Sequence, residues 1–220
     1  MKQECNLQKC FLCSNSLPEW HEAIQTHKTN LQFKKGESLF NAGDEVKGIY
    51  FVYSGTVKVH KKWDDDKELI IRFASNGSIL GHRGLSGDMI YSISATAIEP
   101  VTVCYFDLNF FKWSLKVNHE LAYNLMVFFA GELGQAEQNM HDLALLPVKE
   151  RLKKALIKLR EQFGCDDDGY IKIVLTRHDM ARYVGTTYET LFRTLNELLD
   201  EGFVLLDRKR IKLTSPLVNT

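Results

Sequence analysis

The sequence lacks three features that would each place the protein in a particular class. No stretch of eighteen apolar residues exists, so we expect no membrane-spanning helix. Met1 is followed by Lys, Gln, Glu and Cys rather than an apolar run, so we expect no signal peptide and a cytoplasmic protein. Lys and Arg, 28 in total, equal Asp and Glu, also 28, so the protein as a whole has no net positive charge that would attract polyanions.

Length and charge distribution leave room for two domains of different character. The chain has 220 residues and is 45% hydrophobic, enough for two domains with apolar cores. From Val148 onward, 14 Lys and Arg stand against 11 Asp and Glu, an excess of three positive charges in the C-terminal part. This modest excess permits a DNA-binding face there.

The first half of a helix-turn-helix is predicted from Thr176 onward. Thr176 is a good helix N-cap, and Asp179 stands three residues later, as in a capping box. Apolar residues at helical spacing follow as far as Gly185. Glycine suits the left-handed position that ends a helix, so the first helix is expected to stop there.

A second helix and a wing are predicted next. Thr187 offers a new N-cap, the helix runs from about Tyr188 and it ends at Gly202. Two short strands, 203–206 and 210–213, follow with a basic turn between them. Two helices joined by a Gly-containing turn form the unit whose second helix enters the DNA major groove.

The exposed start of the second helix carries candidate base-reading residues. Glu189 can accept a hydrogen bond from cytosine N4, and Arg193 can donate two to guanine O6 and N7. A surface ion pair at i,i+4 is the alternative interpretation of this spacing, but the basic wing favours DNA. The predicted DNA contacts are Thr176, Thr187, Tyr188, Glu189, Phe192, Arg193, Arg208, Lys209 and Arg210, with Lys212 in the same wing.

A long helix, about 118–146, precedes the DNA-binding region. Seven apolar residues recur in alternating steps of four and three, the pattern of a helix that packs against a partner helix. This dimer seam consists of Ala122, Met126, Phe129, Leu133, Ala136, Met140 and Leu143. Leu121, Leu125 and Phe128 widen the stripe, so one side is expected to pack on its own domain and the other on a second subunit. Pro147 ends the helix and is expected at position N1 of the next, 148–163.

The first half of the chain predicts a β-rich domain. Between Leu31 and Phe106, glycines separate short runs in which apolar and polar residues alternate, for example 48–53 and 56–59. Strands at this spacing suggest an antiparallel barrel or jelly roll.

Two segments carry a resemblance to a known family. The run Glu189-Thr190-Leu191-Phe192-Arg193 resembles the E-T-x-x-R recognition helix of the cyclic-AMP receptor and fumarate–nitrate-reduction regulator (Crp/Fnr) family, and residues 33–59 are similar to the opening of that family's cyclic-nucleotide-binding β-roll. The resemblance covers about 33–214. It implies a homodimeric transcription regulator that reads near-palindromic double-stranded DNA and acts with RNA polymerase. Phe192 departs from the family's small or hydroxyl residue and favours contact with a thymine methyl.

The family's cyclic-nucleotide residues are only partly present. Nucleotide-binding members carry a Gly-Glu pair for the ribose and an Arg-Ser pair for the cyclic phosphate. Here the matching positions are Gly81-His82 and Tyr91-Ser92, so the phosphate would lose its Arg partner and cyclic-AMP binding is not expected. His82 and Arg83 either hold another anion or are surface loop residues. The effector candidates are therefore His82, Arg83, Tyr91 and Ser92.

The cysteines suggest another kind of sensor. Cys5, Cys10 and Cys13 cluster near the N-terminus, and Cys104 stands alone in a predicted strand, 100–106. In the fumarate–nitrate-reduction branch a similar set ligates an oxygen-labile [4Fe–4S] cluster, although its usual spacing differs from C-x4-C-x2-C. Four thiolates suffice for such a cluster or for zinc. Thiol–disulfide sensing, or reduced thiols without function, are the alternatives.

Together these patterns predict an α+β fold: a cysteine-containing segment, 1–17, a jelly-roll sensor domain, 18–117, a dimerisation helix and hinge, 118–147, and a winged helix-turn-helix, 148–220. A regulator that senses a small molecule or thiol redox state is the closest alternative. A cupin-like enzyme or binding module is remote, because only His60 and His82 lie in the roll and a recognition helix has no place in it. We expect no enzymatic activity.

Overall fold

The computed structural model describes residues 8–64, 67–85 and 87–214. These residues form two compact units, one ending at Gly134 and the other beginning at Gln135, so the division falls inside the long helix α4 (His119–Leu145). The predicted boundaries instead place that helix in a segment of its own. No helix in the described ranges is long and apolar enough to cross a membrane.

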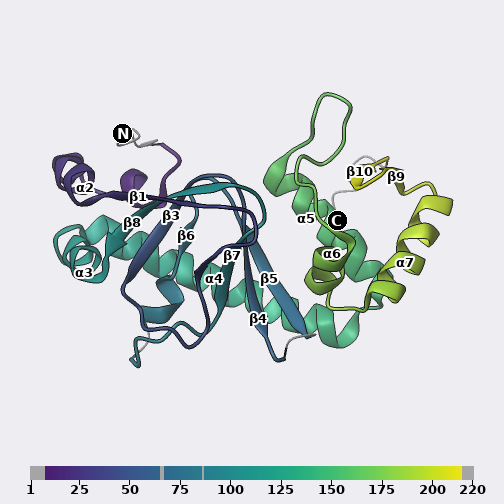
Figure 1. Ribbon diagram of the computed structural model, residues 1–220, viewed down its shortest axis with the longest axis horizontal. Coiled ribbons are helices and arrows are strands. Elements are labelled where there is room, and N and C mark those ends of the chain that lie inside the picture. Colours follow the sequence, from purple (N-terminus) through teal and green to yellow (C-terminus); the bar gives the residue numbers. More distant parts are fainter. Residues whose placement is uncertain (1–7, 65–66, 86, 215–220) are drawn as a thin grey trace. The chain divides into compact units, whose positions relative to one another are not determined.

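The first unit is the expected β-roll with flanking helices (Figure 1). Its strands are β1 (Thr29–Phe33), β2 (Ser38–Phe40), β3 (Gly48–Ser54), β4 (Val57–Lys62), β5 (Glu68–Ala74), β6 (Ile79–Leu80), β7 (Ser94–Ala97) and β8 (Val101–Asp107). Its helices are α1 (Phe11–Ser14), η1 (Pro18–Trp20), α2 (His21–His27), η2 (His82–Leu85), α3 (Leu108–Val117) and the first part of α4. The strands predicted at 48–53, 56–59 and 100–106 are β3, β4 and β8.

The strands form two four-stranded antiparallel sheets, in the orders β1-β8-β3-β6 and β2-β7-β4-β5. The first sheet is buried on both faces, because β3 and β8 carry apolar side chains on each face of the sheet. Val52 and Val103 point to the core between the sheets, whereas Phe51, Cys104 and Phe106 point to a second core under the helices. Successive strand residues face opposite sides, so one apolar strand serves two cores.

The helix α4 begins as part of this second core and then presents its apolar seam. Leu121 and Leu125 are buried with Phe111 and Phe106, which confirms that one side packs on its own domain. The seam residues Met126 and Leu133 are 61% and 62% exposed. A helix that leaves this much apolar surface open in a single chain has a face available for a partner.

The second unit holds the end of α4 and the winged helix-turn-helix. Its further elements are α5 (Val148–Phe163), α6 (Arg177–Val184), α7 (Tyr188–Asp200), β9 (Val204–Asp207) and β10 (Arg210–Leu213). The buried residues of its core are Leu152, Leu156, Leu159, Met180, Ala181, Val184, Leu191, Leu195, Leu198, Val204 and Ile211. The prediction of Pro147 at N1 is wrong by one position: Pro147 is the N-cap, in an extended conformation, and α5 begins at Val148.

Candidate nucleic-acid interface and sensor pocket

The turn between α6 and α7 has the local chemistry that the sequence predicts. The Thr176 hydroxyl accepts a hydrogen bond from the Asp179 amide at 3.0 Å and donates one to its carboxylate at 2.7 Å. Gly185 ends α6 in the left-handed conformation, with φ at 72°. A residue with a side chain would be strained there, so this glycine fixes the angle at which the chain enters α7.

The helix α7 is buried on one side only. Thr187 caps it by accepting from the Thr190 amide at 3.3 Å, and Leu191 and Leu195 lie in the core. Glu189 and Arg193 are exposed one turn apart at the start of the helix. Phe192, 54% exposed, lies beside them on the surface. The capped helix α7 thus presents the carboxylate of Glu189, the guanidinium of Arg193 and the ring of Phe192 to solvent.

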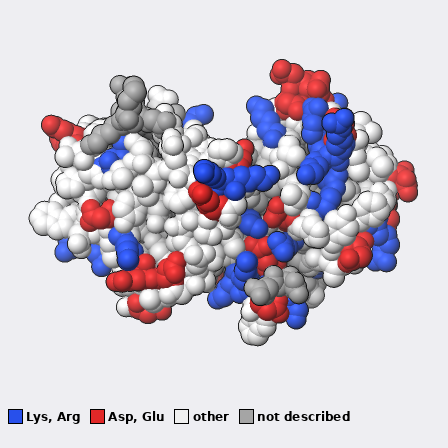
Figure 2. Space-filling model, in the orientation of Figure 1, with Lys and Arg blue, Asp and Glu red and all other residues white. Residues whose placement is uncertain are grey.

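The cations of the wing divide into two groups. Arg208 and Lys209 are exposed at the tip between β9 and β10. Arg210 is engaged within the protein, because its guanidinium lies 2.8 Å from the Asp166 carboxylate and 3.2 Å from that of Asp168. Figure 2 shows the acidic tip of the loop after α5, with Lys and Arg side chains gathered beside β9 and β10.

Two further contacts hold the wing to that acidic loop. The guanidinium of Arg210 stacks on the Tyr170 ring, 4.1 Å from its centre. Lys212 donates to the Asp168 carbonyl at 2.8 Å. Two of the four predicted phosphate-binding cations therefore also have internal partners, and the loop that binds them carried no predicted role.

A single arginine connects the end of α4 with the helix-turn-helix. Arg151 donates to the carbonyls of Val184 and Gly185, each at 3.0 Å, and to that of Leu146 at 3.1 Å. It also donates to the Leu143 carbonyl at 3.3 Å. These carbonyls lie at the C-terminal ends of α4 and α6, where backbone carbonyls have no hydrogen-bond donor within the helix. No sequence pattern identified Arg151, because its acceptors are backbone groups distant in the chain.

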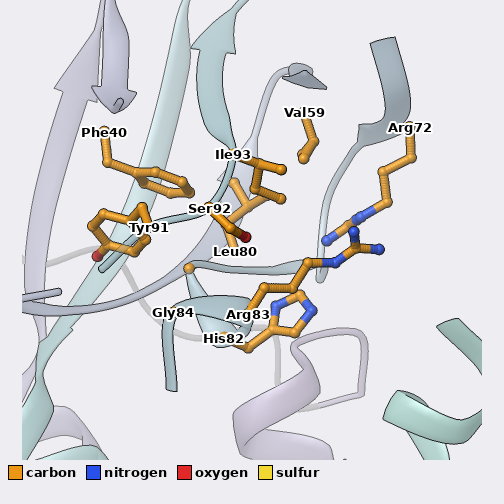
Figure 3. A pocket seen from close by; sticks show the side chains of 11 residues that line it. Phe40, Val59, Arg72, Leu80, His82, Arg83, Gly84, Tyr91, Ser92 and Ile93 are labelled. Carbon is orange, nitrogen blue, oxygen red and sulfur yellow. The ribbon is translucent and has the colours of Figure 1, made fainter. Parts of the chain in front are cut away.

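The roll brings the two predicted effector pairs together at one pocket. Gly81-His82 and Tyr91-Ser92 both line it, together with Phe40 beside Tyr91 and with Arg83 (Figure 3). Phe40 stacks on Tyr91 at 4.0 Å, and the Tyr91 hydroxyl donates to the Gly48 carbonyl at 2.7 Å. The remaining space is about 10 Å³, room for about one water molecule. In this conformation the pocket cannot admit a nucleotide.

His82 is buried rather than part of a surface loop. Its side chain is 2% exposed, and Nε2 lies 2.8 Å from the carboxylate of Glu132 on α4. The interpretation of His82 as a surface residue is therefore wrong, because η2 turns the ring inward under α4. Burial lowers the pKa of His82 below its ordinary value of 6.5, although the bond to Glu132 opposes this shift.

Glu132 and Arg72, which also belong to this site, were missed by sequence reasoning. The Arg72 Nε lies 3.2 Å from Glu132 Oε1. Burial raises the pKa of Glu132, but the hydrogen bond from His82 and the charge of Arg72 outweigh burial and lower it from 4.5 to about 2. No pattern in the sequence distinguishes Glu132 from the other charged residues of this helix.

Three of the four predicted cysteine ligands share one apolar core. Cys13 and Cys104 are buried, 3% and 4% exposed, and Cys10 packs beside them. Cys5 lies outside the described residues. Among residues that the structure describes, no group of three or more His, Cys, Asp or Glu is placed to hold a metal. The thiols thus gather in one region but do not form a metal site in this conformation.

A glycine turn fixes the cysteine segment on the roll. The Phe11 amide donates to the Gly77 carbonyl at 3.0 Å. A Cβ at Gly77, where φ is +89°, would lie 2.0 Å from the Lys9 carbonyl oxygen. The close approach of these two backbones therefore requires glycine.

Comparison with known proteins finds the same two modules in the same order. Residues 30–118 match the family model described as cyclic nucleotide-binding domain, and residues 150–216 match the Crp-like helix-turn-helix domain. The chain is 29% identical to the anaerobic regulatory protein of Bacillus subtilis, over 89% of this chain and 82% of that protein. It is 28% identical to the nitrogen fixation regulation protein FixK of Bradyrhizobium diazoefficiens, over 97% of this chain and 90% of that one.

A solved structure has the same fold. FixK2 from Bradyrhizobium japonicum superposes with a TM-score of 0.76, at 24% identity, over 86% of this chain and 93% of that chain. The curated relatives are transcription regulators and not enzymes, so the cupin-like alternative is wrong.

Proposed function

We propose that this chain, which belongs to the Crp/Fnr family of transcription regulators, binds near-palindromic double-stranded DNA as a homodimer and is switched by an effector at its β-roll. The observation that carries the proposal is the capped helix α7, whose exposed first turns hold Glu189 and Arg193. From its membership of this family we also infer that the protein contacts RNA polymerase and is located in the cytoplasm.

Base reading is assigned to three exposed side chains of α7. Arg193 is long enough to place two hydrogen bonds on guanine, and Glu189 can accept from the cytosine amino group. Phe192 offers an apolar surface for a thymine methyl. Tyr188, Thr176 and Thr187 lie at the ends of the two helices, where contacts to phosphate orient the unit on the duplex.

Replacement of Arg193 tests base reading directly. Arg193→Ala is expected to cost about 1–3 kcal/mol on a matched operator and to relax the preference at one G·C pair per half-site. Binding titrations against operators varied at each position measure both effects. Arg208→Ala, which also removes one exposed positive charge, is the matched control and should weaken all sequences alike. A uniform loss for Arg193→Ala would make Arg193 a phosphate contact and remove it from the base readers.

The seam of α4 supports the homodimer. Its apolar residues are exposed in the single chain, and no charged residue interrupts the series of seven from Ala122 to Leu143. Two such helices packed together would bury this surface and create a two-fold axis. That symmetry matches an operator whose half-sites lie about one helical turn apart.

An effector other than cyclic AMP is proposed for the roll. Tyr91 stands at the position where the nucleotide-binding members carry the Arg for the cyclic phosphate, and the pocket has a free volume of only about 10 Å³. Proteins similar to this chain include cAMP-activated regulators, but also regulators named for anaerobic and nitrogen responses.

The cysteines provide the first sensor hypothesis, a [4Fe–4S] cluster on Cys5, Cys10, Cys13 and Cys104. Its support is that Cys10, Cys13 and Cys104 reach the same apolar core. In this conformation the described thiols do not form a metal site, so we expect cluster binding to rearrange the residues around them. Thiol redox chemistry at the same residues, or a small molecule at the pocket, is the alternative.

A further inference from the structure

Glu132 of α4 is bound by three side chains of the β-roll. Its Oε2 accepts from His82 Nε2 at 2.8 Å and from Arg83 Nε at 3.0 Å. Its Oε1 forms an ion pair with Arg72 Nε at 3.2 Å. Arg72 comes from β5, and the other two partners come from η2. All four residues belong to the first compact unit.

One turn of α4 also encloses the His82 ring. The rings of Phe128 and Phe129 each lie 5.3 Å from it, centre to centre. Because a carboxylate only accepts, His82 Nε2 must carry the proton that it shares with Glu132. Its other nitrogen, Nδ1, is buried and has no hydrogen-bond partner among the described residues.

The positive charge at this point exceeds the negative charge. Burial lowers the pKa of His82, so the ring is neutral at pH 7, and two guanidinium groups then face one carboxylate. Figure 3 shows the Arg72 and Arg83 guanidinium groups directed toward one another, with the His82 ring beside them. The Glu132 carboxylate contacts both guanidinium groups, and its negative charge offsets the repulsion between their positive charges.

The structure assigns to Arg72, His82 and Arg83 a carboxylate-binding site, and the ligand of this site is Glu132 of the same chain. Arg72, His82 and Arg83 also line the roll pocket, so three residues of the pocket wall are bound by a carboxylate of the same chain. The bound Glu132 holds α4 against the roll without any external nucleotide. A tethered ligand has a high effective concentration, so dissolved anions compete poorly with it.

This site connects the pocket with the dimer seam. Phe129 belongs to the seam and also packs on His82, three residues before Glu132. Binding of Glu132 therefore fixes the direction in which α4 presents Phe129. This consequence rests on the proposed homodimer, whereas the binding of Glu132 to the roll does not.

Chemical rescue tests the assignment. Glu132→Ala removes a CH₂–COO⁻ group, which has the size and charge of acetate. Acetate added to the full-length variant should bind Arg72, His82 and Arg83, whereas neutral acetamide should not. Ionic strength is held constant with sodium chloride, because salt screens charged contacts. Glu137→Ala is the matched control, since it removes an exposed carboxylate from the same helix.

Hydrogen exchange of the α4 amides, 125–134, is the primary measurement. In Glu132→Ala their exchange should accelerate at least about tenfold, because charge-assisted hydrogen bonds are lost. Acetate should restore protection in this variant but leave wild type and Glu137→Ala unchanged. In the double variant Glu132→Ala/Arg72→Ala, acetate should restore nothing. Glu132→Gln, which keeps the shape without the charge, serves if the alanine variant fails to fold.

Two results would overturn the assignment. Wild-type protection of α4 in both Glu132→Ala and Glu132→Gln would show that the carboxylate does not hold the helix. Equal rescue by acetate and acetamide would show that shape rather than charge is recognised. Sedimentation of the same samples separates the two proposals: a wild-type monomer contradicts the homodimer, and the exchange data still decide whether Glu132 is the ligand.

Discussion

Arg151 Nη2 donates to the carbonyl of Gly185 at 3.0 Å, which ties the first turns of α5 to the turn before the recognition helix. Its Nη1 binds the carbonyl of Leu146 at the end of α4, so the same guanidinium contacts both sides of the hinge. A planar guanidinium can satisfy several carbonyls in fixed directions, which a lysine cannot do. Arg151 therefore joins the end of α4 to the turn before α7, and we expect it to hold the angle between these helices within the second unit.

The first prediction concerns this angle. Arg151→Lys keeps the charge but cannot bind both sets of carbonyls, so the two recognition helices of a dimer should lose their fixed separation. Operators with the native half-site spacing, and with one base pair added or removed, should then be bound with similar affinity. Affinity for a single half-site should stay close to wild type. If the variant keeps the wild-type spacing preference, Arg151 supports the fold without setting the separation.

Dimerisation by the α4 seam gives the second prediction. Leu133 is 62% exposed in the single chain, and Leu133→Glu would place two like charges opposite each other in the dimer. Light scattering should then report a monomer, and operator binding should be lost. Gln135→Glu adds the same charge to an exposed position off the seam and should remain dimeric. A Leu133→Glu variant that is still a dimer would place the interface elsewhere.

The wing gives the third prediction, because its cations differ in their partners. Neutralising Arg208 or Lys209, which are exposed, should weaken all DNA sequences alike and reduce the salt slope of binding by about 1 for each. Arg210→Gln should change the slope less, since Arg210 already binds Asp166 and Asp168. Titrations at several salt concentrations measure the slope. An unchanged slope after neutralising both Arg208 and Lys209 would direct the wing tip away from DNA.

Acid stability of the roll is the fourth prediction. Burial raises the pKa of Glu68, but hydrogen bonds from His60 and Lys58 outweigh it, and the pKa falls from 4.5 to about 2. The pKa of Glu132 falls by a similar amount. In the unfolded chain these two carboxyls bind protons near pH 4.5, whereas in the folded protein they bind protons only near pH 2. Their contribution to the free energy of unfolding is therefore complete above pH 4.5 and is lost as the pH falls toward 2.

Protonation of His82 causes a separate loss of stability at higher pH. Its pKa is below 6.5 in the folded protein, so the unfolded chain takes up a proton first and stability begins to fall below pH 6.5. Urea unfolding followed by tryptophan fluorescence measures this, because Trp20, Trp63 and Trp113 all lie in the first unit. Glu68→Gln should be less stable at neutral pH and less sensitive to acid between pH 4.5 and 2. Equal acid sensitivity of wild type and this variant would contradict the prediction.

Local patterns were sufficient for the two helices of the helix-turn-helix and for the strands β3, β4 and β8. Thr176, Gly185 and Thr187 carry cap and turn preferences that act over three or four residues, so the helix-turn-helix could be located from the sequence. The alternation in β3 and β8 likewise follows from the strand period. The location of the effector pocket came from the family resemblance, and Gly81-His82 and Tyr91-Ser92 do meet there.

The internal ligands could not be predicted, because they depend on tertiary contacts between distant residues. Arg72, His82 and Glu132 come from β5, η2 and α4, and nothing in their neighbours in the chain indicates that they meet. His82 was expected on the surface for the same reason: its burial depends on Phe128 and Phe129, more than forty residues later. Arg151 binds backbone carbonyls, which have no sequence signature.

The last prediction concerns the cysteines. If Cys5, Cys10, Cys13 and Cys104 ligate a [4Fe–4S] cluster, protein purified without oxygen should be brown, with a broad absorbance at about 400 nm that bleaches in air. Cys104→Ser should then take up less iron than wild type after reconstitution with iron and sulfide under nitrogen. Cys165→Ser is the matched control, because Cys165 lies in the second unit and is not one of the four proposed ligands.

The present arrangement of the thiols sharpens this test. Cys13 and Cys104 are buried in an apolar core against which Trp20 also packs, so we expect cluster binding to change the surroundings of Trp20. Reconstitution should therefore change tryptophan fluorescence in wild type and in Cys165→Ser, but not in Cys104→Ser. If Cys104→Ser binds as much iron as wild type, the four-cysteine hypothesis is wrong. A thiol or small-molecule sensor would then be the better account of the switch.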